Sequence, residues 1–254
     1  RKIRNTFRYL LGNINDNFEN INLDELDLSK LPELEQFMLH KIFVLNDKFK
    51  KYFRNYDFHN LYKELLNFCT VDLSAFYFDI RKDNLYCDPK GSEKRKSTIL
   101  LLNIILNALL KWFAPILSFT TEEIFKLLFK DQKSIHLEKF LEFPEKLKNE
   151  KLSNKWSELI KIRNICNISI EEKRASKEIG SSLEADLKIQ LNQKLKSLTE
   201  NTDFSELCIT SKAEVSYKDD IETTAIASKA KGSKCLVCWK IKETACNRSN
   251  CALN

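Results

Sequence analysis

Apolar positions along the first 130 residues recur with the period of an α-helix. In five stretches they return every three or four residues, the spacing that places them on one helical face. The stretches are residues 3–11, 32–53, 58–81, 93–112 and 120–129. The fourth is apolar nearly all round, as expected for the central helix of a bundle. Thr120 and Glu123 form a capping-box signature for the fifth. Long helices with short connections predict an antiparallel helical bundle over residues 1–150.

The pattern changes after a sixth predicted helix at residues 153–176. Over residues 184–191, Leu and Ile alternate with polar residues, which is the period of a half-buried strand. Two more short strands are predicted at 207–210 and 213–217, and a helix at 192–198. The sequence thus predicts a mainly α protein, with a small α+β module at 151–220 after the bundle. A polar tether, residues 219–234, leads into a cysteine-rich end, and residues 221–254 together form the last predicted region.

Composition is that of an ordinary soluble globular protein, with 43% hydrophobic and 31% charged residues. The longest apolar run, residues 97–117, is interrupted by Asn103, Asn107, Lys111 and Pro115, so we expect no membrane segment. The chain opens with Arg1 rather than Met, and we therefore expect it to be a fragment of a longer protein.

Four of the eight cysteines lie close together near the end, as a Cys-x2-Cys pair and a Cys-x4-Cys pair: Cys235, Cys238, Cys246 and Cys251. Zinc prefers four tetrahedral ligands, and two such pairs are a strong signal for it. So short a segment buries little apolar surface, and metal binding can supply on the order of 10 kcal/mol towards its folding. We predict one structural Zn²⁺ in a C-terminal zinc knuckle.

A redox pair and disulfides are the alternatives for these four cysteines. The remaining four are scattered along the chain, and we interpret them as buried thiols in a reducing cytosol. They are Cys69, Cys87, Cys166 and Cys208.

Positive charge gathers at the same end of the chain. Residues 229–254 hold six cations and one acid, although the net charge of the whole chain is only +6. Such a segment suits a polyanion such as a nucleic-acid backbone, although a solvated tail would carry the same charges. Trp239 is either a base-stacking platform or a lid over the metal. The candidate RNA contacts here are Lys234, Trp239, Lys240, Lys242 and Arg248.

No catalytic constellation is evident. The three histidines, His40, His59 and His136, are far apart in the sequence, and there is no Gly-rich phosphate loop. Glu122 and Glu123 are adjacent carboxylates, but a position in the first turn of a helix explains them through the helix dipole. We predict that the chain alone is a binding part without activity.

Several stretches resemble the C-terminal third of bacterial isoleucyl-tRNA synthetases, which are class I aminoacyl-tRNA synthetases. They are "KIRNTFRYLLGNINDNF", "LYKELLNFCTVDLSAFYFDIRKDNLYCD", "WFAPILSFTTEEIF", "EEKRASKEIGSSLEADLKI" and the final "KCLVCW" with its two later cysteines. The resemblance implies a helical anticodon-binding domain and a terminal zinc module. The valine and leucine relatives lack that module, which favours isoleucine. The last pair departs from the family, where it is normally Cys-x2-Cys.

By this resemblance, the full enzyme activates isoleucine with ATP and transfers it to its tRNA. ATP and Mg²⁺ belong to a catalytic domain that this chain lacks. The chain is expected to bind the anticodon arm of the isoleucine tRNA, as a cytoplasmic monomer. Arg4 and Arg8, on one polar face, are then phosphate contacts or solvated surface.

Three other hypotheses remain. The chain could be a free-standing zinc-containing nucleic-acid adaptor, the corresponding part of a valine or leucine synthetase, or a scaffold that docks another protein.

Overall fold

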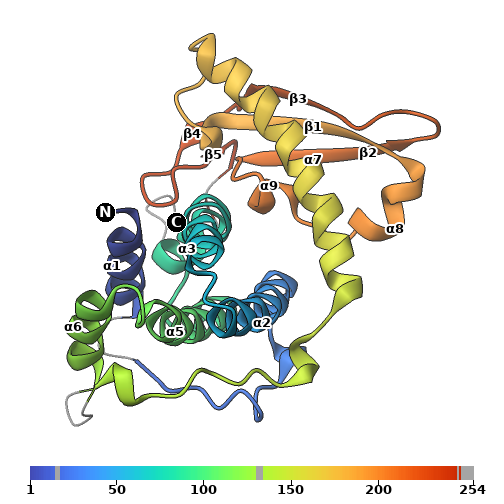
Figure 1. The fold of residues 1–254 in the computed structure, drawn as a ribbon. Coiled ribbons are helices and arrows are strands. Elements are labelled where there is room, and N and C mark those ends of the chain that lie inside the picture. Colours follow the sequence, from blue (N-terminus) through green and yellow to red (C-terminus); the bar gives the residue numbers. More distant parts are fainter. Residues whose placement is uncertain (15–17, 130–133, 245, 247–254) are drawn as a thin grey trace. The chain divides into compact units, whose positions relative to one another are not determined.

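The computed structural model describes residues 1–14, 18–129, 134–244 and 246 (Figure 1). The chain forms two compact units. The first consists of Arg1–Leu85 and Lys90–Glu150, and the second of Tyr86–Pro89 and Lys151–Asn254.

The first unit is a helical bundle, as the apolar periodicity predicts. Its helices are α1 (Lys2–Ile14), α2 (Glu33–Arg54), α3 (Phe58–Asn67), a π-helical segment η2 (Phe68–Phe78), α4 (Asp79–Cys87), α5 (Glu93–Phe113) and α6 (Ser118–Leu128). Short 3-10 turns lie at η1 (Leu28–Lys30), η3 (Ile135–Leu137) and η4 (Glu145–Leu147). Helix α5 contacts α1, α2 and α6 and is therefore the central helix (Figure 1).

Helix α5 is central because it is apolar on nearly every side. The Ser92 hydroxyl caps its first turn by accepting the Arg95 N–H at 3.5 Å. Near its other end the fully buried Trp112 packs its ring 4.9 Å from that of Phe49 and donates Nε1–H to Asn46 Oδ1 at 3.0 Å. By length and composition α5 could also cross a membrane, but 78% of that stretch is buried inside the protein, as in a core helix.

Two local predictions in the first unit are wrong. The stretch predicted as one α-helix over 58–81 has a π-helical middle, η2, and continues to Cys87. Thr120 does not cap α6, because the helix begins at Ser118 with Leu117 as its N-cap residue. Glu122 instead accepts from Ser134 Oγ at 2.8 Å and from the Ile135 N–H. These bonds lower the pKa of Glu122 and hold the next turn against α6.

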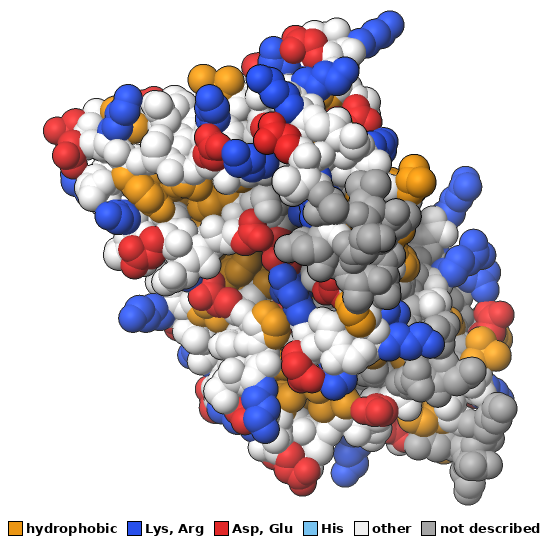
Figure 2. All heavy atoms as spheres, turned by 180° about the vertical axis from the view of Figure 1, so that it is seen from behind, with side chains coloured by type: hydrophobic (Ala, Val, Ile, Leu, Met, Phe, Trp, Pro, Cys, Tyr) orange, Lys and Arg blue, Asp and Glu red, His pale blue; other side chains and the backbone are white. Residues whose placement is uncertain are grey.

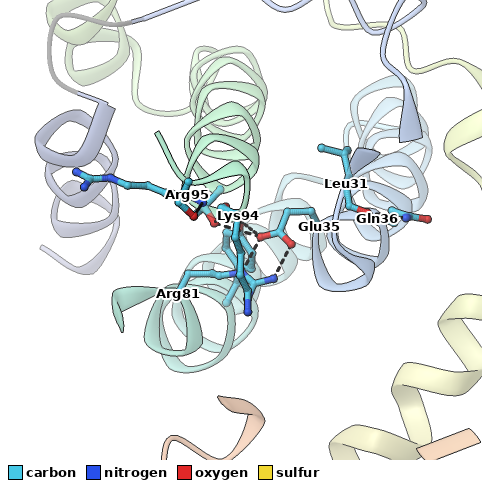
Figure 3. A network of polar contacts seen from close by, with 9 residues as sticks. Leu31, Glu35, Gln36, Arg81, Lys94 and Arg95 are labelled. Carbon is cyan, nitrogen blue, oxygen red and sulfur yellow. Dashed lines mark hydrogen bonds and ion pairs between the residues drawn. The ribbon is translucent and has the colours of Figure 1, made fainter. Parts of the chain in front are cut away.

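A buried ion pair joins α2 to α4 (Figure 3). The Glu35 carboxylate is fully buried and accepts two bonds of 2.6 Å from Arg81, through Nε and Nη2. It also accepts from the Tyr77 hydroxyl at 3.0 Å and from Thr98 Oγ1 at 3.4 Å. Burial, and then the Glu35 charge, raise the pKa of Tyr77 well above its usual value. Three helical segments and α5 thus meet at one carboxylate.

The second unit is an α+β module with a mixed sheet. Its elements are α7 (Glu150–Ala175), η5 (Ser182–Glu184), β1 (Ala185–Asn192), η6 (Gln193–Leu195), α8 (Lys196–Thr199), α9 (Phe204–Leu207), β2 (Lys212–Lys218), β3 (Thr224–Lys229), β4 (Ser233–Lys234) and β5 (Ile241–Lys242). The strand order of the main sheet is β2-β1-β3. Strand β1 pairs in parallel with β2, where Ile189 lies opposite Val215, and antiparallel with β3, where Ile189 lies opposite Ala225.

Helix α7 crosses one face of this sheet (Figure 1). The alternation predicted for β1 is present, because Leu187, Ile189 and Leu191 are buried while the residues between them are more exposed. Ser169 of α7 fixes the outer strand, since its Oγ accepts the N–H of Ala227 in β3 at 2.9 Å. The predicted strand at 213–217 is also confirmed, as β2.

Two predictions in the second unit are wrong. Residues 207–210 are not a strand. Asp203 caps the short helix α9 by accepting the N–H groups of Ser205 and Glu206, and Ile209 then has a left-handed backbone with φ of 57°. The polar tether predicted over 219–234 is not a plain linker either, because Thr224–Lys229 forms β3 and pairs with β1.

Candidate metal centre

A short hairpin, Ser233–Lys242, presents the first two cysteines of the cluster; we call it the cysteine hairpin. Its strands β4 and β5 pair with Ser233 opposite Lys242. At the tip, the Cys235 N–H donates to Lys240 O at 2.9 Å and the Trp239 N–H donates to Cys235 O at 3.0 Å. Trp239 closes this turn in the left-handed region, with φ of 62°, which is uncommon outside glycine.

Gly232 lets the two strands approach. Its φ is +120°, and a Cβ placed there would lie 2.2 Å from the carbonyl oxygen of Lys242. A side chain at this position would push β5 away from β4. The hairpin therefore depends on a glycine immediately before its first strand.

Three buried sulfurs converge at this hairpin. The Sγ atoms of Cys235, Cys238 and Cys246 all lie within 4.8 Å of one another, and their residues are 0%, 5% and 0% exposed. Sulfurs bound at about 2.3 Å to one tetrahedral zinc lie roughly 3.8 Å apart, so this donor set fits such an ion. The Lys242 ammonium lies 3.1 Å from Cys246 Sγ, where its charge favours the thiolate form that binds metal. The cluster could thus hold a metal. Cys251, the fourth predicted ligand, lies outside the described residues.

The α+β module holds the cysteine hairpin through one serine and one ion pair. Ser211 Oγ accepts the Ile241 N–H at 2.6 Å and donates to Leu183 O at 2.5 Å. Lys234 Nζ lies 3.2 Å from Glu184 Oε1. The pKa of Glu184 is lowered first by the Gly180 N–H and then by Lys234. Nothing in the sequence pattern indicates the role of Ser211, because it joins segments that are far apart in the chain.

Among the described residues, Cys69, Cys166 and Cys208 are buried thiols that form no disulfide. Burial raises the pKa of Cys69 to about 12, which makes it an unreactive thiol. Cys166 and Cys208 form a buried pair linked by a hydrogen bond; that bond, followed by burial, raises the pKa of Cys208.

The predicted RNA contacts at the hairpin differ in their surroundings. Trp239 is 61% exposed, whereas the partly buried Val237 packs on the cysteine cluster. Lys240 is partly buried, Lys234 is in its ion pair and Lys242 lies against Cys246. Arg248 lies outside the described residues.

Arg4 and Arg8 are exposed on α1 in the first unit. They line a groove of about 640 Å³ together with apolar residues of α1 and α6. Arg4 Nη2 pairs with Glu123 Oε2 at 2.8 Å, and both side chains are more than 60% exposed. On the face drawn in Figure 2, Lys and Arg side chains are intermingled with Asp and Glu. Among the described residues on that face, positive charge is therefore not gathered into one large patch.

Sequence comparison gives the class of protein to which the chain belongs. Residues 35–191 match the family model described as the anticodon-binding domain of tRNA ligase. This match covers more than half of the chain, and the chain belongs to this family.

The similar curated proteins include isoleucine–tRNA ligases. The one from Pelagibacter ubique is 65% identical over 248 residues, which are 98% of this chain and 27% of that protein. Those from Bartonella henselae and Agrobacterium fabrum are 36% and 37% identical, over 94% and 95% of this chain. The chain thus spans about a quarter of the length of these relatives.

Proposed function

We propose that this chain is the tRNA-recognition part of an isoleucine–tRNA ligase. The observation that carries the proposal is the 65% identity to one such ligase across 98% of the chain, together with the family match. The whole protein would activate isoleucine with ATP and transfer it to tRNA, and the parts that use ATP and Mg²⁺ would lie outside this chain. The chain alone would have no ligase activity.

The binding partner that this proposal implies is the anticodon arm of the isoleucine tRNA. Unstacked loop bases can be read on their faces and edges, whereas the deep groove of duplex RNA cannot be. Trp239 supports this role, because it is 61% exposed at the tip of the cysteine hairpin with Lys240 directly after it. An exposed indole beside a cation is suited to stacking on a base and contacting its phosphate.

A phosphate contact at Arg4 and Arg8 belongs to the same proposal. Arg4 would exchange Glu123 for an RNA phosphate, and the exchange costs little because exposed ion pairs contribute only about 0–1 kcal/mol. Lys234 and Lys242 would add longer-range attraction while remaining with Glu184 and Cys246.

We further propose one structural Zn²⁺, held by Cys235, Cys238, Cys246 and Cys251. The support is the set of three buried sulfurs that a zinc-sized ion fits, with a lysine beside one of them. When bound, the metal supplies cross-links to a segment that has almost no apolar core. Buried thiols elsewhere in the chain suit the reducing cytoplasm, and we expect a monomer there.

The test is binding of unmodified tRNA transcripts to the purified chain at several salt concentrations. We expect the isoleucine tRNA to bind more tightly than a valine tRNA, with affinity that falls as salt rises. Trp239→Ala should lose about 1–3 kcal/mol of binding free energy if the indole stacks on one base. Leu236→Ala is the matched control, since Leu236 is 76% exposed on the same hairpin. Equal binding of both tRNAs would contradict the proposed specificity.

Measurement of the metal content of the purified chain tests the proposed zinc site. One zinc per chain, with weaker tRNA binding after its removal, is the expected result. A chain purified without zinc that also takes up none would contradict the proposed metal.

A further inference from the structure

Another cysteine, Cys87, lies beside the three convergent sulfurs of Cys235, Cys238 and Cys246. Cys87 is the last residue of α4, and with Tyr86–Pro89 it belongs to the second unit. It is 6% exposed and packs in one buried cluster with Cys235, Cys238 and Cys246. Cys87 also contacts Val237, which is 150 residues further along the chain. Sequence spacing cannot indicate such a contact, and the scattered position of Cys87 predicts only an ordinary buried thiol.

Cys87 contacts the turn between Cys235 and Cys238, which orients the sulfurs of these two residues. Its Sγ lies 3.7 Å from the carbonyl oxygen of Val237, in the geometry of an S–H donor. Val237 stands between Cys235 and Cys238, and its side chain also packs on the cluster. Among the described residues, the group of sulfurs within 4.8 Å of one another contains Cys235, Cys238 and Cys246 but not Cys87. Cys87 thus lies next to the donor set and outside it.

We propose that Cys87 is a positioning residue of the metal site. It donates its S–H to the Val237 carbonyl, which fixes the Cys-x2-Cys turn, and it forms one wall that keeps water from the sulfurs. Groups that hydrogen-bond or enclose the ligands of a metal typically change its affinity by 10–100-fold when they are removed. The inference rests on the proposed zinc site and deepens it by adding a residue from a distant part of the chain.

Two variants distinguish the hydrogen bond that Cys87 donates from its role in keeping water away from the sulfurs. Cys87→Ala removes the donor and opens the wall. Cys87→Ser keeps a donor but shortens its reach, and it fills more of the space than alanine does. We expect zinc affinity, measured by competition with a chromophoric chelator, to fall about 10-fold or more in Cys87→Ala and by less in Cys87→Ser. Cys69→Ala is the matched control, because Cys69 is a fully buried thiol of the first unit and should leave zinc affinity unchanged.

Cobalt substitution shows whether Cys87 positions the turn or binds the metal. The sulfur-to-cobalt charge-transfer absorption per bound Co²⁺ grows with the number of thiolate ligands. We expect the same intensity in wild type and Cys87→Ala, with weaker binding in the variant, and a lower intensity in Cys246→Ser. Intensity lost in Cys87→Ala would make Cys87 a ligand and overturn the positioning role.

Unchanged zinc affinity in both Cys87 variants would also overturn the inference, while leaving the proposed zinc site intact. Failure of the wild-type chain to bind Zn²⁺ or Co²⁺ would instead overturn the zinc site itself, and the inference with it. Circular dichroism of each variant before metal is added shows whether its helices are intact, and Cys87→Ser keeps the comparison available if the alanine variant misfolds.

Discussion

Removing the guanidinium of Arg81 should strongly destabilise the first unit. Glu35 is fully buried and receives two 2.6 Å bonds from Arg81, which is itself only 3% exposed. In Arg81→Met the aliphatic volume is largely kept, but the carboxylate loses both guanidinium bonds while it keeps those from the hydroxyls of Tyr77 and Thr98. Breaking a buried pair from one side typically costs about 3–5 kcal/mol, because an uncompensated charge stays behind.

The double variant Glu35→Leu/Arg81→Met gives the decisive comparison. Replacing both partners removes the buried charge as well as its compensation, and such replacements are often neutral or stabilising. We therefore expect the double variant to be more stable than Arg81→Met by roughly 2 kcal/mol or more. This non-additivity would show that the cost of the single substitution comes from the charge that is left unpaired.

Urea unfolding followed by Trp112 fluorescence measures these effects. Trp112 is fully buried in the first unit, and the other two tryptophans, Trp156 and Trp239, can be changed to Phe in the background. This matters because two units can unfold in separate transitions, and a single probe isolates one of them. A loss below about 1 kcal/mol in Arg81→Met would put the pair in the range of exposed ion pairs and refute the reasoning. So would a double variant as unstable as the single one.

Three further predictions follow from individual contacts. Burial lowers the pKa of His40 below 6.5 despite the nearby Glu150, and its Nδ1 accepts the Asn149 N–H at 2.9 Å. The unfolded chain therefore binds the extra proton first, so the free energy of unfolding should fall as pH drops from about 7 through the folded pKa. His40→Gln should flatten that profile. Asn46→Ala should cost about 1–3 kcal/mol in urea unfolding, since it strands the buried indole N–H of Trp112. Gly232→Ala should weaken zinc binding in chelator competition by separating β4 from β5, whereas Gly91→Ala, with no atom within 4 Å of the added Cβ, should not.

The bundle could be predicted because each long helix has an apolar face that repeats many times. The elements that were missed are short and held by tertiary contacts. Strand β3 turns the small residues Ala225 and Ala227 inward, so its alternation has little hydrophobic contrast, and a bond from Ser169 completes it. The helix α9 did have a sequence signal, Asp203 as a cap before Ser205 and Glu206, which a strand prediction at 207–210 overlooked.

The candidate metal site was only partly predictable for a related reason. Spacing identifies Cys235 and Cys238, because ligands close in sequence can be aimed by one local turn. Spacing says nothing about Cys87 or Ser211, which reach the hairpin through the fold. The number of cations at the chain's end predicts that Lys242 attracts RNA, but such a count cannot indicate the local contact of its ammonium with Cys246 Sγ.

Strand β3 also changes the mechanics of the chain's end. A flexible linker of about sixteen residues would let its cargo sample a radius of roughly 20 Å. Here only residues 230–232 separate the end of β3 from the start of β4. The hairpin that presents the Trp239 indole is therefore attached to strand β3 of the sheet by a short connection, which we call the hairpin arm. Any force that a bound nucleotide exerts on this arm would reach the amide hydrogens shared by β1 and β3, so hydrogen exchange at β1 would register an event at the hairpin tip.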